Sequence, residues 1–327
     1  MMKSVSENKT IEAQSQTTWG LLRRFPQFSI LLTFVILFIF LSFATDAFFS
    51  VANLINVLRQ ASTQMIVSIG MTFVLILGGI DLSVGSVACL TGTMTAGLMV
   101  RSNVPTALAL LIGVLLGIVI GIINGVIISK VKIPPFIATL AMMSTARGAA
   151  LIYSGGYPIT NMPEDALFLG RGYIGGIPVP VIIMVLLVVL AWVTLTSTKF
   201  GRHTYAIGGN EECARLSGIK VDRTKIAVYA ISGASAAITG ILLTMRLASS
   251  QPTLGNGLEL DAIAAVVLGG TSLFGGRGYV LGTILGALFL TVLGNGLNIL
   301  SVGSFWQQFL KGIILIIAVS LYEKRKK

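Results

Sequence analysis

One carboxylate lies inside a strongly apolar stretch of the chain, where a charged side chain is unusual. Asp81 follows Gly78 and Gly79, and a carboxylate in such surroundings is costly unless it is paired, hydrated or facing a cavity. It could line or gate a path through an apolar layer. The simpler interpretation, which we favour, is that it caps the next helix by accepting from the N–H of Ser83 or Val84.

Three further charged residues border or interrupt apolar stretches, and their purpose is ambiguous. Arg147 could pair with a carboxylate, extend its side chain to a membrane interface, or face a path, and the sequence leaves all three possibilities open. Glu259 and Asp261 stand in a polar stretch before a short apolar segment. They could contact a partner protein, but capping of the following helix is the slightly favoured interpretation.

Motifs for catalysis or metal binding are missing from the sequence. There is no phosphate-binding loop, no H-E-x-x-H and no G-x-S-x-G motif, so we expect no enzyme and no cofactor or metal held by this chain. The single histidine, His203, lies in a basic segment and reads as a solvated side chain. Cys89 and Cys213 are far apart and have no metal-ligand spacing, so neither a disulfide nor a metal site is expected.

The most informative polar segment is residues 199–225, KFGRHTYAIGGNEECARLSGIKVDRTK. After a Gly-Gly break, Asn210 is a good N-cap, and Glu211 and Glu212 then lie at the positive end of the helix dipole. Arg215 continues the helix, and Gly218 is a natural stop. The segment therefore predicts a helix of about two turns. It is either a solvated loop helix or a docking helix for a partner protein.

The composition excludes a soluble domain. Apolar residues make up 54% of the 327 residues and charged residues only 11%, against about 25% charged in an average soluble domain. The mean hydropathy is +0.90. These values predict an all-α polytopic membrane protein in which the bilayer is the main contact surface.

Basic residues fix the expected orientation. Lys and Arg number 23 against 12 Asp and Glu, a balance of +11, and 16 of the 23 lie in four short polar segments. Bases in short loops mark the cytoplasmic side of a membrane, so this charge does not indicate nucleic-acid binding. Ten spans place all four segments, and both termini, on that side. We expect spans near residues 28–43, 62–77, 84–100, 105–129, 136–153, 180–196, 226–247, 262–273, 279–300 and 305–321.

Other segments complete the predicted organisation. Residues 50–60 read as a separate amphipathic helix near the interface, and residues 154–179 as an external loop. The first span is expected to stay uncleaved. We divide the chain into a cytoplasmic N-terminal segment at residues 1–26, a transmembrane domain at 27–322 with its large cytoplasmic loop at 198–225, and a basic tail at 323–327.

Glycines form two patterns. Gly113, Gly117, Gly121 and Gly125 fall on one face of a predicted span, where they let a neighbouring helix approach closely. The stretch LGGIDLS at 77–83 resembles LGGTSL at 268–273, and both interrupt apolar regions. Paired broken helices often mark a transport pathway, although chance similarity is an equally good explanation in a glycine-rich chain.

Four blocks of sequence carry a family resemblance. They are GMTFVLILGGIDLSVGSV (70–87), KIPPFIATLAMM (132–143), GRHTYAIGGNEECARLSGI (201–219) and SSQPTLGNGLELDAIAAVVLGGTSLFGGRG (249–278). In this order and spacing, the chain resembles the inner-membrane permease subunits of sugar ATP-binding-cassette importers. Residues 1–26 match nothing in that pattern.

The resemblance implies a function that the composition alone does not show. Such permeases work in pairs, as two copies or two paralogues, in the bacterial cytoplasmic membrane. A separate cytoplasmic ATPase binds ATP and magnesium and docks on the loop helix, and an extracytoplasmic binding protein delivers the sugar. A pentose such as ribose is favoured, and an ion-coupled secondary sugar transporter is the main alternative. A membrane enzyme and a passive channel are weaker ones.

Site residues follow from the same resemblance together with the residue chemistry. The expected ATPase-coupling residues are Gly209, Asn210, Glu211, Glu212, Arg215 and Gly218. The candidates for the translocation path are Asp81, Ser83, Asn124, Arg147 and Asn295. The candidates for binding-protein contacts are Glu164, Asp165, Glu259 and Asp261.

Overall fold

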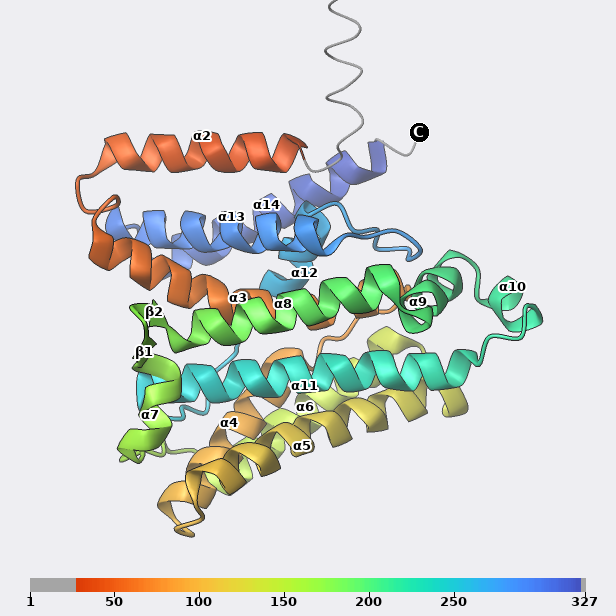
Figure 1. The fold of residues 1–327 in the computed structure, drawn as a ribbon, viewed down its shortest axis with the longest axis horizontal. Helices are drawn as coiled ribbons and strands as arrows, with labels where there is room; N and C mark the ends of the chain where they lie inside the picture. The colour runs from red at the N-terminus through yellow and green to blue at the C-terminus, as the bar shows by residue number, and fades with distance from the viewer. Residues whose placement is uncertain (1–27, 325–327) are drawn as a thin grey trace, which may run out of the picture.

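A computed structural model describes residues 28–324 of the chain as a bundle of long, roughly parallel and antiparallel helices (Figure 1). The predicted N-terminal segment 1–26 and the last three residues of the predicted basic tail lie outside the described residues. The α-helices are α2 (Phe28–Ala44), α3 (Val51–Ile76), α4 (Val84–Val100), α5 (Thr106–Val126), α6 (Pro135–Ser154), α7 (Glu164–Arg171), α8 (Val179–Ser197), α9 (Lys199–Gly209), α10 (Glu211–Leu216), α11 (Val221–Leu247), α12 (Leu258–Leu268), α13 (Val280–Ile299) and α14 (Ser304–Lys324).

The all-α membrane class is confirmed by the length and apolarity of these helices. Five of them are long and apolar enough to cross a bilayer, and two shorter apolar helices, Ile30–Ala44 and Val84–Val100, accompany them. The five long candidates are Thr106–Val131, Pro135–Ser154, Val179–Ser197, Val221–Leu247 and Val280–Ile299.

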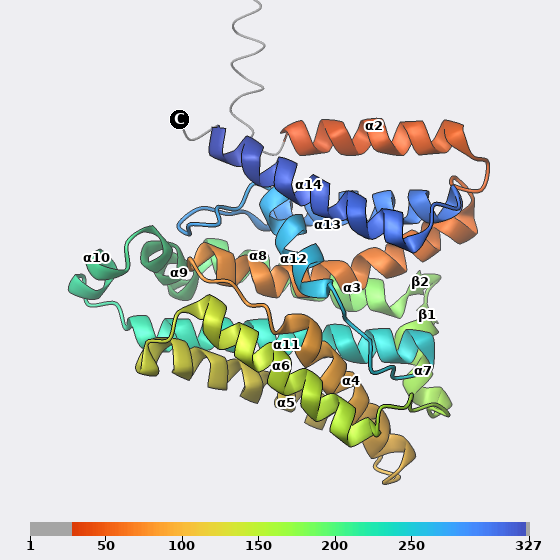
Figure 2. The same cartoon turned by 180° about the vertical axis from the view of Figure 1, so that it is seen from behind.

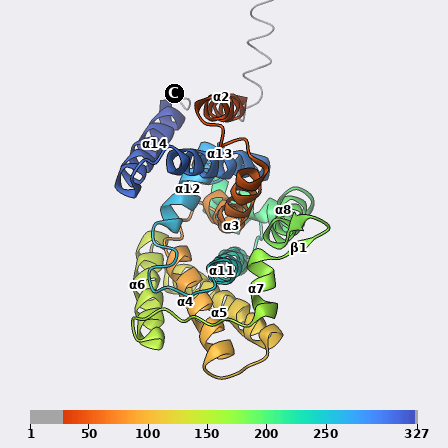
Figure 3. The ribbon, with the colours of Figure 1, turned by 90° about the vertical axis from the view of Figure 1, so that its left-hand side faces the viewer.

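Helix α11 lies in the middle of the bundle. Viewed along the helices, it is surrounded by α3, α4, α5 and α7 (Figure 3). The second half of α3 is equally enclosed, because residues 65–77 are all buried. By contrast, α5, α6 and α8 expose apolar side chains along their outer faces, as helices in contact with lipid must.

The glycine face predicted in residues 113–125 packs α5 against α11. A Cβ on Gly117 would meet the carbonyl oxygen of Gly233, and a Cβ on Gly125 would lie 2.6 Å from the Cα of Ile226. Gly121 is likewise closed in by the backbone of Tyr229. The small-residue stripe therefore sets the close approach of these two helices, as its spacing predicts.

One predicted boundary is wrong because nothing in the sequence stops the helix. The separate amphipathic helix at 50–60 and the second span at 62–77 form the single helix α3. Ser50 caps its start by accepting from the N–H of Asn53 at 3.3 Å. No glycine or proline follows until Gly70, so the helix continues from the interface into the core.

The predicted external loop at 154–179 contains regular structure. It holds α7 and a hairpin of β1 (Tyr173–Ile174) and β2 (Ile177–Pro178), paired antiparallel. Gly175 and Gly176 form the two-residue turn with φ of +59° and +82°, which is the conformation that a tight hairpin requires. Figure 1 shows α7 and the hairpin at the end of the bundle opposite α9 and α10.

Helix α12 is short and begins inside the bundle. It starts at Leu258 after Gly257, whose φ is +79°, and ends at Leu268 before Gly269. The sequence predicts this span at 262–273, so the true helix begins and ends earlier. Glu259 and Asp261 consequently lie in its first turn rather than outside it.

The two ends of the described chain lie on the same side of the bundle. In Figures 1 and 2, α2 runs from the side of α9 and α10 toward the hairpin end, and α14 runs back from the hairpin end toward that side.

The fourth predicted span, α5, continues into a π-helical turn at Ile127–Val131, which ends at Lys132 in the left-handed conformation (φ +62°).

Candidate functional site

The helix predicted after the Gly-Gly break is α10, and its caps have the predicted geometry. The Oδ1 atom of Asn210 accepts from the N–H of Cys213 at 2.9 Å, which satisfies a free donor of the first turn. At the other end Gly218 is left-handed (φ +82°). Its N–H donates to Arg215 O at 3.0 Å, and that of Ile219 donates to Ala214 O at 3.1 Å, which is a Schellman motif.

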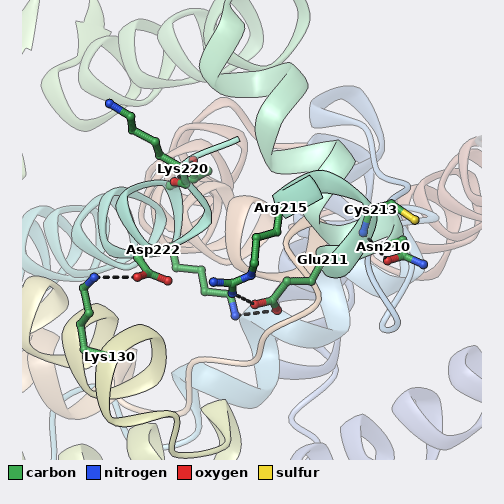
Figure 4. Close-up of polar contacts among 9 residues, drawn as sticks. Lys130, Asn210, Glu211, Cys213, Arg215, Lys220 and Asp222 are labelled. Carbon is green, nitrogen blue, oxygen red and sulfur yellow. Dashed lines mark hydrogen bonds and ion pairs between the residues drawn. The ribbon is translucent and has the colours of Figure 1, made fainter. Parts of the chain in front are cut away.

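Glu211 links α10 to α11 by an ion pair. Its Oε1 accepts from Arg215 in the same helix at 3.1 Å, and its Oε2 accepts from Nζ of Lys225 in α11 at 2.7 Å (Figure 4). Partial burial works to raise the pKa of Glu211, but the hydrogen bonds and charges of Lys225 and Arg215 outweigh it and lower that pKa. The ion pairs therefore hold α10 against the first turns of α11.

A second ion pair continues this link. Nζ of Lys130, in the π-helical turn after α5, lies 2.6 Å from a carboxylate oxygen of Asp222 at the start of α11 (Figure 4). The sequence analysis missed Lys130, Asp222 and Lys225 as partners. Each is one base or acid among several in polar segments, and only the fold brings them together.

The outward face of α10 is free of contacts to the bundle. Glu212, Cys213 and Leu216 are exposed, and Leu216 keeps 81% of its surface accessible. The sequence analysis gave no weight to Leu216, which adds an apolar contact to a charged surface. An exposed helix that carries an apolar side chain at its end and is held by ion pairs on its other face suits a docking surface.

A group of glycines joins the end of α9 to two breaks in the bundle. We call Gly78, Gly208, Gly275 and Gly276 the glycine junction. The N–H of Gly276 donates to the carbonyl of Ile76, the last residue of α3, at 2.9 Å. A Cβ on Gly208 would meet that same carbonyl oxygen, and a Cβ on Gly275 would lie 2.9 Å from the Cα of Gly78. Three backbone segments thus touch where no side chain would fit.

This junction also relates the two similar glycine stretches of the sequence. The first, at 77–79, ends α3, and the loop that follows the second, at 268–270, packs on it. The end of α3 and the loop at Gly275 and Gly276 are therefore next to α9, which leads directly into α10. The end of α3 and the loop before α13 thus contact the helix that precedes α10.

Asp81, Ser83 and Asn124 come together in the interior. Both the N–H and the Oγ of Ser83 donate to Oδ1 of Asp81, at 2.9 and 2.6 Å, and Oγ of Ser232 in α11 donates to Oδ2 at 2.7 Å. Asn124 donates from Nδ2 to Oγ of Ser83 at 3.0 Å. The four side chains are at most 1% exposed, so the cluster fixes the turn between α3 and α4 to α5 and α11.

The hydrogen bond expected from the N–H of Ser83 to Asp81 is present, but Asp81 is not the helix cap, because the N-cap of α4 is Ser83 and no side chain makes a capping hydrogen bond there. Ser232, which the sequence analysis missed, supplies the third hydrogen bond. It is one of several small polar residues in an apolar helix, so its position carried no signal. In this arrangement the carboxylate is enclosed by protein, and a role in a path stays a prediction.

Arg147 holds the segment before α12. From α6 it donates through Nη1 to the carbonyls of Pro252 at 3.0 Å and Leu254 at 2.8 Å. The sequence left a carboxylate partner, the interface or a path as alternatives, and the contacts here are with backbone carbonyls. The fifth path candidate, Asn295 in α13, lies apart from both groups, because it exchanges two amide hydrogen bonds with Asn53 at 2.9 and 3.1 Å.

The four acids predicted to contact a binding protein fall on two helices. Glu164 and Asp165 form the exposed first turn of α7, at the hairpin end of the bundle. Glu259 and Asp261 are half-buried in the first turn of α12. All four lie where acids favour the helix dipole, and their part in partner contacts is untested.

A helical bundle with membrane-length apolar helices, short broken helices and one exposed helix held by ion pairs defines a polytopic membrane protein. The comparisons with known proteins agree. The family described as "Branched-chain amino acid transport system / permease component" matches residues 53–319, and the chain belongs to this family. The predicted resemblance to permease subunits is confirmed.

Several similar relatives are named for the transport of a sugar. The chain is 52% identical to the ribose import permease protein of Bacillus subtilis over 89% of its own length and 90% of the relative's. It is 45% identical to the ribose import permease protein of Escherichia coli K12 over 90% and 93%. A xylose transport system permease protein of Escherichia coli K12 is 34% identical over 92% of both chains. No solved structure matches the chain.

Proposed function

We propose that the chain is the transmembrane permease subunit of an ATP-binding-cassette importer for a monosaccharide, ribose or a related pentose. The observation that carries this proposal is the identity of 45–52% to ribose import permeases over about nine-tenths of the chain. The relatives named for xylose are more distant, and the family description names another class of substrate. Relatedness along nearly the whole length therefore favours ribose.

The proposed topology has ten spans with both termini in the cytoplasm. The antiparallel course of α2 and α14 supports it, as does the concentration of bases around α9, α10 and the start of α11. The segment 248–257 and the short α12 together make one crossing. The ten spans are α2, α3, α4, α5, α6, α8, α11, α12, α13 and α14.

In this proposal α10 is the coupling helix. Two permease copies, or a copy and a paralogue, share a path, and a cytoplasmic ATPase that binds ATP and magnesium docks on each α10. Movement of α10 reaches α11 through Glu211 and Lys225, and reaches the ends of α3 and the loop before α13 through the glycine junction. The path then opens in turn to either side of the bacterial cytoplasmic membrane, after an extracytoplasmic binding protein has delivered the sugar.

The test is transport in reconstituted vesicles with the ATPase and the binding protein of the same organism. We expect uptake of labelled ribose ahead of xylose and of hexoses, and only with ATP and both partners. Glu212→Ala with Leu216→Ala, on the outward face of α10, should abolish ATPase association and uptake while the protein stays folded. Uptake that follows an ion gradient, or that continues without the ATPase, would show an ion-coupled transporter or a channel instead.

A further inference from the structure

Three arginines from distant parts of the sequence meet at the hairpin end of the bundle. Arg59 in α3 donates from Nη2 to the carbonyl of Arg171 at 2.7 Å, and Arg171 donates from Nε to the carbonyl of Arg246 at 2.8 Å. Arg246, in the last turn of α11, donates to Oδ1 of Asn56 at 3.1 Å. We call Arg59, Arg171 and Arg246 the arginine trio.

The trio is held in place by neutral groups. The guanidinium of Arg59 also lies 4.6 Å from the ring centre of Tyr173 in β1, a cation–π contact. Among residues 28–324, the ion pairs of the structure join Glu211 or Asp222 to other cations, and none includes a member of the trio. A guanidinium has five N–H donors, so each of these arginines keeps donors to spare.

Among residues 28–324, Glu164 and Asp165 form no ion pair with the trio. Glu164 and Asp165 lie on the first turn of α7, whereas Arg171 is at its last residue, and each is placed where it favours the helix dipole. The charges of Arg59 and Arg246 act on each other unfavourably across the end of the bundle. Three like charges in one group are unfavourable unless an anion joins them.

The position and residue type of the trio are both informative. It lies at the end opposite α10 (Figure 1), which is the extracytoplasmic side in the proposed topology, where bases are generally depleted. Its three members are all arginine, whereas lysines predominate in the four basic segments of the sequence. The planar fork of arginine matches a carboxylate in a bidentate way, and lysine does not.

We infer that the arginine trio is the docking site for acidic side chains of the extracytoplasmic sugar-binding protein. The inference rests on the proposed function and adds the chemistry of that contact. Arg171, exposed at the end of α7, makes the first contact, and the half-buried Arg59 and Arg246 strengthen the field around it. Carboxylates on the partner supply the charge that the trio lacks.

The experiment measures binding of ribose-loaded binding protein from the same organism to the permease in nanodiscs of neutral phosphatidylcholine. The variants are Arg171→Glu, Arg171→Lys and, as a control at an arginine outside the trio, Arg101→Gln. Arg101 also donates to backbone carbonyls, those of Tyr153 and Ser154, and lies over the ring of Tyr153. It therefore tests the loss of an arginine with similar contacts outside the trio.

We expect Arg171→Glu to weaken binding by about tenfold or more and to reduce its dependence on salt. Arg171→Lys should fall between it and the wild type, and Arg101→Gln should bind like the wild type. An acidic-to-arginine substitution on the binding protein should restore binding to Arg171→Glu.

Wild-type affinity in Arg171→Glu would overturn the inference while leaving the proposed function intact. So would an effect seen only when phosphatidylglycerol is added to the nanodiscs, since the trio would then bind lipid phosphates. If the wild-type permease fails to bind any sugar-binding protein, and also fails in the uptake test, the proposed function itself is wrong.

Discussion

At the scale of single residues, Glu211 shows how one side chain can set the position of a helix. Its two oxygens bind cations from α10 and α11 separately, so removing the carboxylate loosens one helix from the other. The group is partly exposed, and such ion pairs contribute at most about 1 kcal/mol to stability. Its importance therefore lies in geometry more than in global stability.

Acid should weaken this link. The pKa of Glu211 is lowered in the folded protein, so its stabilising contribution is complete at neutral pH and is lost as the pH falls below the ordinary range of a glutamate, about 4.3, and through the lowered value. Glu211→Gln should remove this part of the acid dependence and reduce ATPase stimulation at neutral pH. Thermal unfolding of both proteins, followed from about pH 7 down to about pH 2 so that the scan passes through the lowered pKa, checks the first effect, and ATPase assays check the second. Identical pH profiles of unfolding for the wild type and Glu211→Gln would contradict the predicted role of this carboxylate in the acid dependence.

Asp81 tests whether an enclosed carboxylate serves the fold or the path. Asp81→Ala leaves the donors of Ser83 and Ser232 without an acceptor, which costs about 1–3 kcal/mol for each unsatisfied group. Asp81→Asn keeps one acceptor and should be milder. If Asp81 is structural, transport should fall in step with thermal stability across the two variants. Loss of transport in a fully stable Asp81→Asn protein would instead indicate a direct role in the path.

Residue-level predictions succeeded where the chemistry is local. The capping of α10 by Asn210 and its end at Gly218 follow from three or four neighbouring residues, so the sequence contains what is needed. Ser232 and Lys225 are more than a dozen residues from the groups that they bind, and many similar residues surround them. The arginine trio was missed for the same reason, because its members are single bases spread over the chain.

At the scale of elements, adjacent glycines in α9 have different surroundings. A Cβ on Gly208 would collide with the carbonyl of Ile76, whereas nothing lies within 4 Å of a Cβ on Gly209. Gly208→Ala should therefore push α9 off the end of α3, lower the thermal stability and uncouple transport from ATP hydrolysis. Gly209→Ala is the matched control for packing and should leave the thermal stability unchanged. Equal behaviour of the two variants would show that the glycine junction is not a tight contact.

Element boundaries could be predicted where residues punctuate the chain. Helix α10 has a cap and a stop, and it was expected almost as observed. Helix α3 has no break between its interfacial and its buried part, and a change from amphipathic to fully apolar residues looked like a boundary. For α12, the start is set by the left-handed Gly257 and by packing against the rest of the bundle, which a local pattern does not encode.

At the scale of the whole molecule, the two cysteines offer a direct test of the proposed orientation. Cys213 is exposed on α10, and Cys89 is buried in α4. A membrane-impermeant maleimide should label Cys213 in inside-out vesicles only. The second test introduces Tyr157→Cys, at a position that is 76% exposed near the hairpin end, into a Cys213→Ser protein. This cysteine should be labelled in right-side-out vesicles and not in inside-out vesicles. Labelling of both positions from one side would contradict the proposed topology.

Helix α10 also has the properties of an exchangeable module. The space beside Gly209 and Gly218, the glycines on either side of it, is open, and only Glu211 ties its side chains to another helix by an ion pair. Residues between these glycines could thus be replaced by those of a foreign permease without disturbing the interior, provided that Glu211 and the buried Ala214 remain. If the ATPase docks on α10 as proposed, such a chimaera should work with the ATPase of the other system while it still transports its original sugar, and the choice of ATPase and the choice of sugar would be separable.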